Sequence, residues 1–216
     1  MCDSSVVTRA QKDLNYRSII NGAFVNSCDG SSICTLARIF YGDDLVSVNG
    51  PEIFEEYIRH PYKQVILGNT IDIVEKVRKK MKSTGLDDDH IEHMDLPFCK
   101  VDDFNYQSIA DEINKQGYDI IWVSLGNPKQ EIFMSRILKY LDKGVMFGIG
   151  AALNFYVGEV SLPKAHIGSL KFIWLTRLFE DKRQWKASWD FLKIIPSLYL
   201  NERKKARTIQ STEKST

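Results

Sequence analysis

Residues 120–131 read IIWVSLGNPKQE, an apolar run that ends at a glycine and then turns polar and charged. The segment Ile120–Leu125 is typical of a buried strand, and Gly126 permits the turn that follows it. A helical pattern then runs from about Pro128 to Leu141. The stretch therefore predicts a strand, a tight turn and a helix.

The residues after the glycine suit a helix start. Asn127 is a good N-cap, Pro128 fits the first helical position, and Gln130 completes an Asn-x-x-Gln pattern that resembles a capping box. A helix start of this kind needs no ligand to explain it. A functional interpretation is equally open, because the free amides and the dipole of such a start favour an anion such as phosphate.

The same alternation of strand and helix recurs on both sides of this stretch. Further predicted strands are Gln64–Leu67, Phe98–Val101 and Val145–Ile149, and further predicted helices are Thr70–Ser83 and Tyr106–Gln116. Alternation at this rhythm implies right-handed crossovers and a mostly parallel sheet. The predicted fold class is α/β, a Rossmann-like, mostly parallel sheet with flanking helices.

Glycines follow the predicted strands at three places. Gly68, Gly126 and the run Gly148–Ala151 each come directly after an apolar segment. The carboxyl ends of parallel strands meet at one edge of a sheet, and ligands bind there in α/β folds. We therefore expect these three loops to form a common binding edge.

The charge is divided unevenly along the chain. Residues 1–160 carry 17 Lys and Arg against 23 Asp and Glu, whereas residues 161–216 carry 12 against 5 and hold three of the four tryptophans. Cations interleaved with aromatic residues suit an anionic partner such as a phospholipid surface. The sequence predicts an α/β domain over residues 1–165, a helical, basic and aromatic C-terminal appendage over 166–203, and a disordered tail over 204–216.

Several classes of protein are excluded or disfavoured. The longest apolar runs are far shorter than the roughly 20 residues of a membrane span, and residues 1–13 do not resemble a secretory signal. We therefore expect a cytosolic protein. Nothing in the basic quarter matches a nucleic-acid motif, and Gly148–Gly150 does not continue into a dinucleotide fingerprint.

Cysteines and histidines do not form a metal pattern. The cysteines are Cys2, Cys28, Cys34 and Cys99, without C-x-x-C spacing, and we expect them to be free thiols. The acidic stretch DDDHIEHMD, Asp87–Asp95, would place His90 and His93 together if it were helical. It is better explained as a solvated acidic loop between a helix and a strand, so no metal site is predicted.

Five segments resemble one known family. VSLGNPKQE (123–131) closely resembles the G-x-P-K-Q-E signature of the WecG/TagA/CpsF glycosyltransferases, glycosyltransferase family 26. The other matching segments are NSCDGSSI (26–33), SVNGPEIF (47–54), GIGAALNFYVGEVSLPK (148–164) and IWLTRLFEDKRQWK (173–186). The resemblance covers the chain from about Ser5 to Lys186.

The resemblance implies an inverting enzyme that moves a hexosamine-type sugar from a UDP-sugar to an undecaprenyl-diphosphate-linked acceptor in bacterial surface polysaccharide or teichoic acid synthesis. N-acetylmannosamine, or its uronic acid, is the first choice of donor. The basic, aromatic quarter adds an anionic membrane surface to the expected partners, nucleic acid is not expected, and the sequence leaves a homo-oligomer open. The implied location is the cytoplasm, peripherally at the inner face of the cell membrane.

The resemblance also implies roles for individual residues. Asp29 matches the family's proposed catalytic base, and Gln130 matches a glutamine that contacts the donor sugar. Arg177 and Arg183 match arginines that close over the donor diphosphate, so that neither a metal nor a cofactor is needed. The implied substrate-binding residues are Gly30, Gly68, Gly126, Asn127, Lys129, Gln130, Gly150, Asn154, Arg177 and Arg183.

The chain departs from the family pattern at several positions. Leu153-Asn154 replaces Phe-Asp, Ser47 replaces an arginine, and the interval from Arg177 to Arg183 is one residue shorter than usual. The family also has several tens of residues ahead of the point matching Met1, including a T-x-N motif, which implies a truncated or misassigned start or a degenerate enzyme. The alternative function is a non-catalytic, nucleotide-sugar-binding homologue that acts as a partner subunit.

Overall fold

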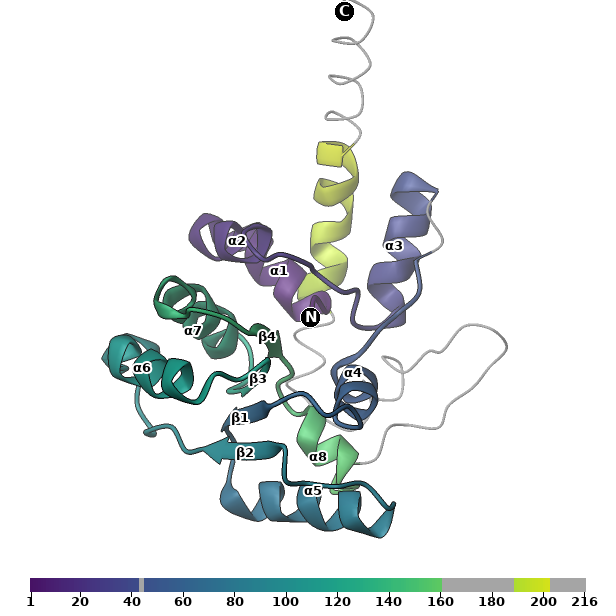
Figure 1. Cartoon of the computed structure of the whole chain (residues 1–216). Coiled ribbons are helices and arrows are strands. Elements are labelled where there is room, and N and C mark those ends of the chain that lie inside the picture. Colours follow the sequence, from purple (N-terminus) through teal and green to yellow (C-terminus); the bar gives the residue numbers. More distant parts are fainter. Residues whose placement is uncertain (43–44, 161–188, 203–216) are drawn as a thin grey trace, which may run out of the picture. The chain divides into compact units, whose positions relative to one another are not determined.

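The computed structural model describes residues 1–42, 45–160 and 189–202 (Figure 1). These residues divide into two compact units. The sheet unit comprises Met1, residues 18–27 and residues 48–160, and the helical unit comprises residues 2–17, 28–42, 45–47 and 189–202. No helix within the described ranges combines the length and the apolar character that a membrane span requires.

The sheet unit is built on four parallel strands. In spatial order they are β2 (Ile91–Met94), β1 (Gln64–Gly68), β3 (Ile120–Ser124) and β4 (Val145–Gly148). All neighbouring pairs are parallel, so each connection is a crossover that carries a helix or a loop over one face. This confirms the predicted α/β fold class.

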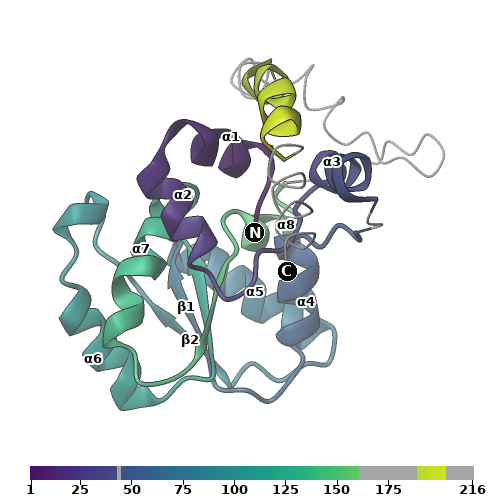
Figure 2. The ribbon, with the colours of Figure 1, turned by 90° about the horizontal axis from the view of Figure 1, so that it is seen from above.

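Helices cover both faces of the sheet, as Figure 2 shows. On one face lie α4 (Gly50–Tyr57), α5 (Ile71–Ser83) and α8 (Ala152–Tyr156), and on the other lie α6 (Tyr106–Gln116) and α7 (Lys129–Ile137). Alternate strand residues supply the two cores: Ile66 and Trp122 face the first, and Val65 and Val123 face the second. Burial on both faces explains why β1 and β3 read as largely apolar runs.

The local sequence accounts for where individual helices begin and end. Asn49 caps α4 by accepting from the Glu52 amide, and the Glu52 carboxylate accepts from the Asn49 amide in return, which is a complete capping box. The Asn105 side chain caps α6 by accepting from the Ser108 amide. Gly117 ends that helix in the left-handed conformation. Two short 3-10 helices, Val101–Asp103 and Leu138–Tyr140, complete the connections.

One predicted strand is wrong. Phe98–Val101 is not a strand, and Val101 opens a 3-10 helix instead. The strand lies earlier, at Ile91–Met94, inside the segment predicted to be an acidic loop. The physical reason is that β2 is an edge strand with only its first residue buried, so it does not need an apolar run. Phe98, which suggested the strand, is fully exposed.

The helical unit contains α1 (Ser4–Lys12), α3 (Ser31–Tyr41) and a helical segment at 189–202, while α2 (Leu14–Asn21) crosses the boundary between the units. Lys12 of α1 forms an ion pair with Asp190 at 2.9 Å, and Phe40 of α3 packs against Tyr199 with ring centroids 5.6 Å apart. The described part of the predicted C-terminal appendage is therefore helical and contacts α1 and α3. The predicted tail, 204–216, lies outside the described residues.

Candidate functional site

The three glycine loops lie at one edge of the sheet, as predicted. Gly68 pairs in register with Ser124, and Val123 pairs with Gly148, so β1, β3 and β4 end side by side. The loops that leave these strands contain Asn69, Gly126 and Gly150. The carboxyl edge of the sheet therefore holds the candidate site of the sheet unit.

Neighbouring side chains lie close to two of the glycines. At Gly68, where φ is +79°, a Cβ would lie 2.8 Å from Leu125 Cδ2, and this backbone conformation itself favours glycine. At Gly148, a Cβ would lie 3.1 Å from Met134 Sδ and 3.3 Å from Gln130 Nε2, so these side chains would have to shift slightly to admit it.

A chain of hydrogen bonds joins the loops. Asn69 Nδ2 donates to Ser124 Oγ at 3.2 Å, and Ser124 Oγ donates to the Gly150 carbonyl at 2.7 Å. The Gly150 amide then donates to Gln130 Oε1 at 2.9 Å. Ser124 of β3 and Gln130 of α7 thus hold the Gly150 loop through its carbonyl and its amide.

Gln130 does not complete a capping box, which corrects the sequence prediction. The N-cap of α7 is Pro128, the Asn127–Pro128 peptide bond is cis, and no side chain caps the helix. The Gln130 carboxamide is instead buried, with its oxygen on the Gly150 amide and its Nε2 donating to Glu131 Oε1 at 2.8 Å. Its partner is 20 residues away in sequence, so the local spacing that suggested a cap was misleading.

The other predicted residues of the sheet unit occupy different environments. Asn127 is exposed and Gly126 adopts a φ of +73° at the turn into α7. Lys129 donates to the Cys99 carbonyl at 2.6 Å and lies 4.9 Å from the Phe104 ring centroid, so in this structure its ammonium group is engaged within the sheet unit. Asn154 lies half-buried in α8, close in sequence to Gly150.

Asp29 and Gly30 lie in the helical unit, immediately before α3. The Asp29 amide donates to the Cys2 carbonyl at 3.0 Å, and Gly30 is the N-cap of α3 with a φ of +96°. Ser47 holds this loop: its Oγ accepts from the Gly30 amide at 3.0 Å and donates to the Cys28 carbonyl at 3.4 Å. The Ser47 hydroxyl thus supports the backbone around Asp29.

Arg177 and Arg183 lie outside the described residues. Their assignment to the donor diphosphate is therefore a prediction from sequence, like the roles of the other predicted site residues.

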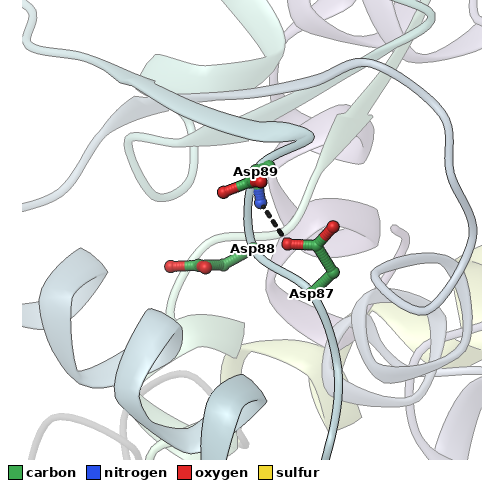
Figure 3. Close-up of side chains that lie close together, drawn as sticks. All are labelled: Asp87, Asp88 and Asp89. Atoms are coloured by element: carbon green, nitrogen blue, oxygen red, sulfur yellow. Dashed lines mark hydrogen bonds between the residues drawn. The ribbon is translucent and has the colours of Figure 1, made fainter.

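The acidic stretch Asp87–Asp95, for which no metal site was predicted, begins with three neighbouring carboxylates. Asp87, Asp88 and Asp89 have carboxylate oxygens within 4.8 Å of one another (Figure 3). Asp88 forms an ion pair with Lys82 at 3.1 Å, and Asp87 accepts from the Asp89 amide at 3.0 Å. These contacts account for the cluster as part of the loop before β2.

The two histidines beside this loop bind backbone atoms. His90 Nε2 lies 3.0 Å from the Ile58 carbonyl, and His93 Nε2 lies 3.2 Å from the Gly68 carbonyl. His93 belongs to a strand, so the helical spacing that a shared metal would have required does not arise.

Sequence reasoning missed two residues of the carboxyl edge, Asn69 and Ser124. Asn69 has a φ of +65°, the only positive φ of a non-glycine residue within the described ranges. Asparagine tolerates this conformation better than most residues, and backbone strain of this kind concentrates at functional sites. The sequence did contain a signal for Asn69, since it is an asparagine that directly follows a strand and the glycine at its end.

A parallel sheet covered by helices on both faces, with glycine loops at its carboxyl edge, defines a Rossmann-like α/β protein. The profile of the Glycosyl transferase WecG/TagA/CpsF family matches residues 1–208, and the chain belongs to this family. It is 22% identical over 216 residues to the N-acetylglucosaminyldiphosphoundecaprenol N-acetyl-beta-D-mannosaminyltransferase of Bacillus subtilis (strain 168). That similarity covers 95% of this chain and 80% of the relative. The resemblance drawn from the sequence motifs is confirmed.

Proposed function

We propose that the protein transfers a hexosamine-type sugar, with N-acetylmannosamine as first choice, from a UDP-sugar to an undecaprenyl-diphosphate-linked acceptor. The observation that carries this proposal is the family membership, because the Bacillus subtilis relative is named for this donor sugar and a lipid-linked acceptor of this kind. The pathway would be the synthesis of a bacterial surface polysaccharide or teichoic acid. A lipid-linked acceptor supports a location at the inner face of the cell membrane.

The proposed reaction assigns the donor to the carboxyl edge of the sheet. Gln130 and Ser124 fix the Gly150 loop at this edge through its amide and its carbonyl. A loop held in this way needs no rearrangement when a nucleotide diphosphate arrives. Arg177 and Arg183 would neutralise the departing diphosphate, as a metal ion does in other transferases.

Asp29 is proposed as the general base. Its carboxylate would take the proton from the acceptor hydroxyl while that oxygen attacks the anomeric carbon of the donor and the bond to UDP breaks. Attack from the face opposite the leaving group inverts the anomeric configuration. The Ser47 hydroxyl supports this loop through Gly30 and Cys28.

The test is a transfer assay with purified protein, UDP-N-acetylmannosamine and a lipid-linked N-acetylglucosamine acceptor, with chelator present. We expect release of UDP and a product one sugar heavier by mass spectrometry. Other UDP-hexosamines, tested in parallel, identify the donor. Absence of transfer from every donor would reject the enzyme.

A second function, a non-catalytic nucleotide-sugar-binding subunit, is favoured by the replacements at Ser47 and Asn154. Binding distinguishes it from the enzyme. A UDP-sugar at about a hundred times its dissociation constant would stabilise either protein by roughly 2.7 kcal/mol in thermal melting. Stabilisation without transfer supports the binding subunit, and the absence of both rejects the two functions together.

A further inference from the structure

The hydrogen-bond chain of the carboxyl edge ends at Glu131, in the first turn of α7. The Gly150 amide donates to Gln130 Oε1 at 2.9 Å, and Gln130 Nε2 donates to Glu131 Oε1 at 2.8 Å. The other Glu131 oxygen, Oε2, is buried and has no hydrogen-bond partner among the described residues. The chain thus runs from the Gly150 loop through one carboxamide to one carboxylate.

The two neighbours of the Gln130 carboxamide allow it only one orientation. A carboxamide accepts hydrogen bonds at its oxygen and donates them from its nitrogen. The Gly150 amide can only donate, so it requires the oxygen, and an ionised Glu131 carboxylate can only accept, so it requires the nitrogen. The reversed carboxamide would place two donors together at Gly150 and two acceptors together at Glu131. Glu131 therefore keeps the Gln130 oxygen on the Gly150 loop.

Gln130 joins two of the glycine loops. Its side chain is buried against the end of β4, where a Cβ at Gly148 would lie 3.3 Å from Gln130 Nε2. Its backbone amide donates to the Gly126 carbonyl at 2.9 Å, while its side chain accepts from the Gly150 amide. A change in the position of Gln130 would therefore reach both loops.

The Glu131 carboxylate is poorly suited to a role in stability alone. A buried, charged oxygen without a partner costs more free energy than a carboxylate in the first turn of a helix gains from the helix dipole. An apolar side chain of similar length would leave no unpaired oxygen. The presence of a carboxylate here is therefore explained by its effect on Gln130 rather than by a gain in stability.

We propose that Glu131 is a positioning residue for sugar transfer, which acts through Gln130 to hold the Gly150 loop where the donor binds. The hydrogen-bond chain itself stands on the measured distances, whereas its effect on transfer rests on the proposed function. A displacement of about 1 Å at a binding or catalytic group lowers a rate by about a hundredfold. A loosened Gly150 loop should have an effect of this order.

Glu131→Met tests the proposal, because methionine has a similar length and helix propensity but cannot hold the Gln130 nitrogen in place. The variant loses one hydrogen bond and also loses the unpaired oxygen, so its melting temperature should stay within about 4 °C of wild type. Its turnover in the transfer assay should fall by about tenfold to a hundredfold. A role in stability alone predicts the reverse, a lower melting temperature with unchanged turnover of the folded protein.

Glu131→Gln is the conservative variant. Its carbonyl oxygen can accept from Gln130 Nε2, so it should recover most of the turnover that the methionine variant loses. The matched control is Glu112→Met, which changes an exposed glutamate of α6 in the same unit. It should have the turnover and the melting temperature of wild type.

Hydrogen exchange of the Gly150 amide, followed by NMR without substrate, tests the positioning independently of activity. Exchange should be at least about tenfold faster in Glu131→Met than in wild type, and close to wild type in Glu131→Gln and Glu112→Met. Unchanged exchange in Glu131→Met, a melting temperature more than about 4 °C below wild type, or no recovery of turnover in Glu131→Gln would overturn the proposal. Wild-type protein that transfers no sugar would count against the proposed function alone, since the exchange of Gly150 is measured without substrate.

Discussion

Among single residues, Asp29 bears most directly on the proposed reaction. Asp29→Asn removes the proton acceptor but keeps the size of the side chain and the backbone bond to Cys2. Turnover should fall by about two to four orders of magnitude, the usual contribution of a general base, while donor affinity stays unchanged. UDP release and calorimetric titration of the donor measure the two quantities.

The matched control is Asp89→Asn, which changes an exposed carboxylate of the sheet unit. It should retain full turnover. Equal losses in the two variants, or a loss of donor affinity in Asp29→Asn, would argue against a base at Asp29.

Gln130 shows what the sequence can and cannot reveal about a single residue. Its place in the G-x-P-K-Q-E motif marked it for the site, but the spacing from Asn127 suggested a local capping bond that the structure does not contain. Its oxygen accepts from the Gly150 amide instead. Local spacing carries information about neighbours within one turn, whereas a contact across 20 residues depends on how β3 and β4 align.

At the scale of elements, the Ser124 hydroxyl joins the loops after β1 and β4, because it accepts from Asn69 and donates to the Gly150 carbonyl. Ser124→Ala leaves the Gly150 carbonyl and the Asn69 amide group without this partner. The free energy of unfolding should fall by about 1–3 kcal/mol, and donor affinity should fall because the Gly150 loop is released. Thermal melting and UDP titration measure the two effects.

Ser124→Thr is the control, since it keeps the hydroxyl at the same position. It should recover most of the donor affinity that the alanine variant loses. An alanine variant that binds UDP as tightly as wild type would show that the hydrogen-bond chain supports the fold without shaping the donor site.

A second contact between elements should give the stability a characteristic pH dependence. The Tyr118 hydroxyl, just before β3, donates to Glu92 Oε2 on β2 at 2.6 Å, and burial together with this carboxylate raises the pKa of Tyr118 above its usual value of about 10. A raised folded-state pKa stabilises the protein fully below the unfolded value, and this stabilisation is lost as the pH rises through the folded value.

Tyr118→Phe should therefore lower the free energy of unfolding by about 1 kcal/mol at pH 7, and the difference from wild type should shrink above about pH 10. Denaturant unfolding across this range measures the difference. Tyr62→Phe, which changes a half-exposed tyrosine, should show no such trend. A difference for Tyr118→Phe that is constant from pH 7 upward would exclude this linkage.

The strands differ in how well the sequence predicts them. β1, β3 and β4 lie within one or two residues of their predicted bounds, because β1 and β3 are buried on both faces and β4 carries its own apolar run. β2 was misplaced because an edge strand buries little, and the polar residues of Ile91–Met94 give no periodic signal. Its position is set by pairing with β1, which local sequence does not encode.

At the scale of the whole molecule, the division into two units matters for the proposed reaction. The predicted donor loops lie in the sheet unit, whereas Asp29 lies in the helical unit with the segment at 189–202. Sequence motifs identified both sets of residues without showing that they belong to different units. The prediction for the general base and the prediction for the donor loops therefore concern different units of the chain.

The proposed acceptor is linked to a membrane lipid, and the C-terminal quarter of the chain is basic. Both features predict that the protein binds an anionic membrane surface. The full chain should sediment with vesicles that contain anionic lipid, and high salt should weaken the binding. Replacing Lys171, Lys182 and Lys186 with glutamine removes three cations of this quarter. Because each cation near an anionic surface contributes about 1 kcal/mol, vesicle affinity should fall by about a hundredfold.

The matched control removes the same charge from the sheet unit, where Lys79, Lys115 and Lys139 are exposed. Glutamine at these three positions should leave vesicle binding within about threefold of wild type, since only cations within about a Debye length of the surface contribute. Similar losses in the two triple variants would mean that net charge alone drives the binding. A full-length protein that stays in the supernatant with anionic vesicles at low salt would remove the membrane from the proposed function.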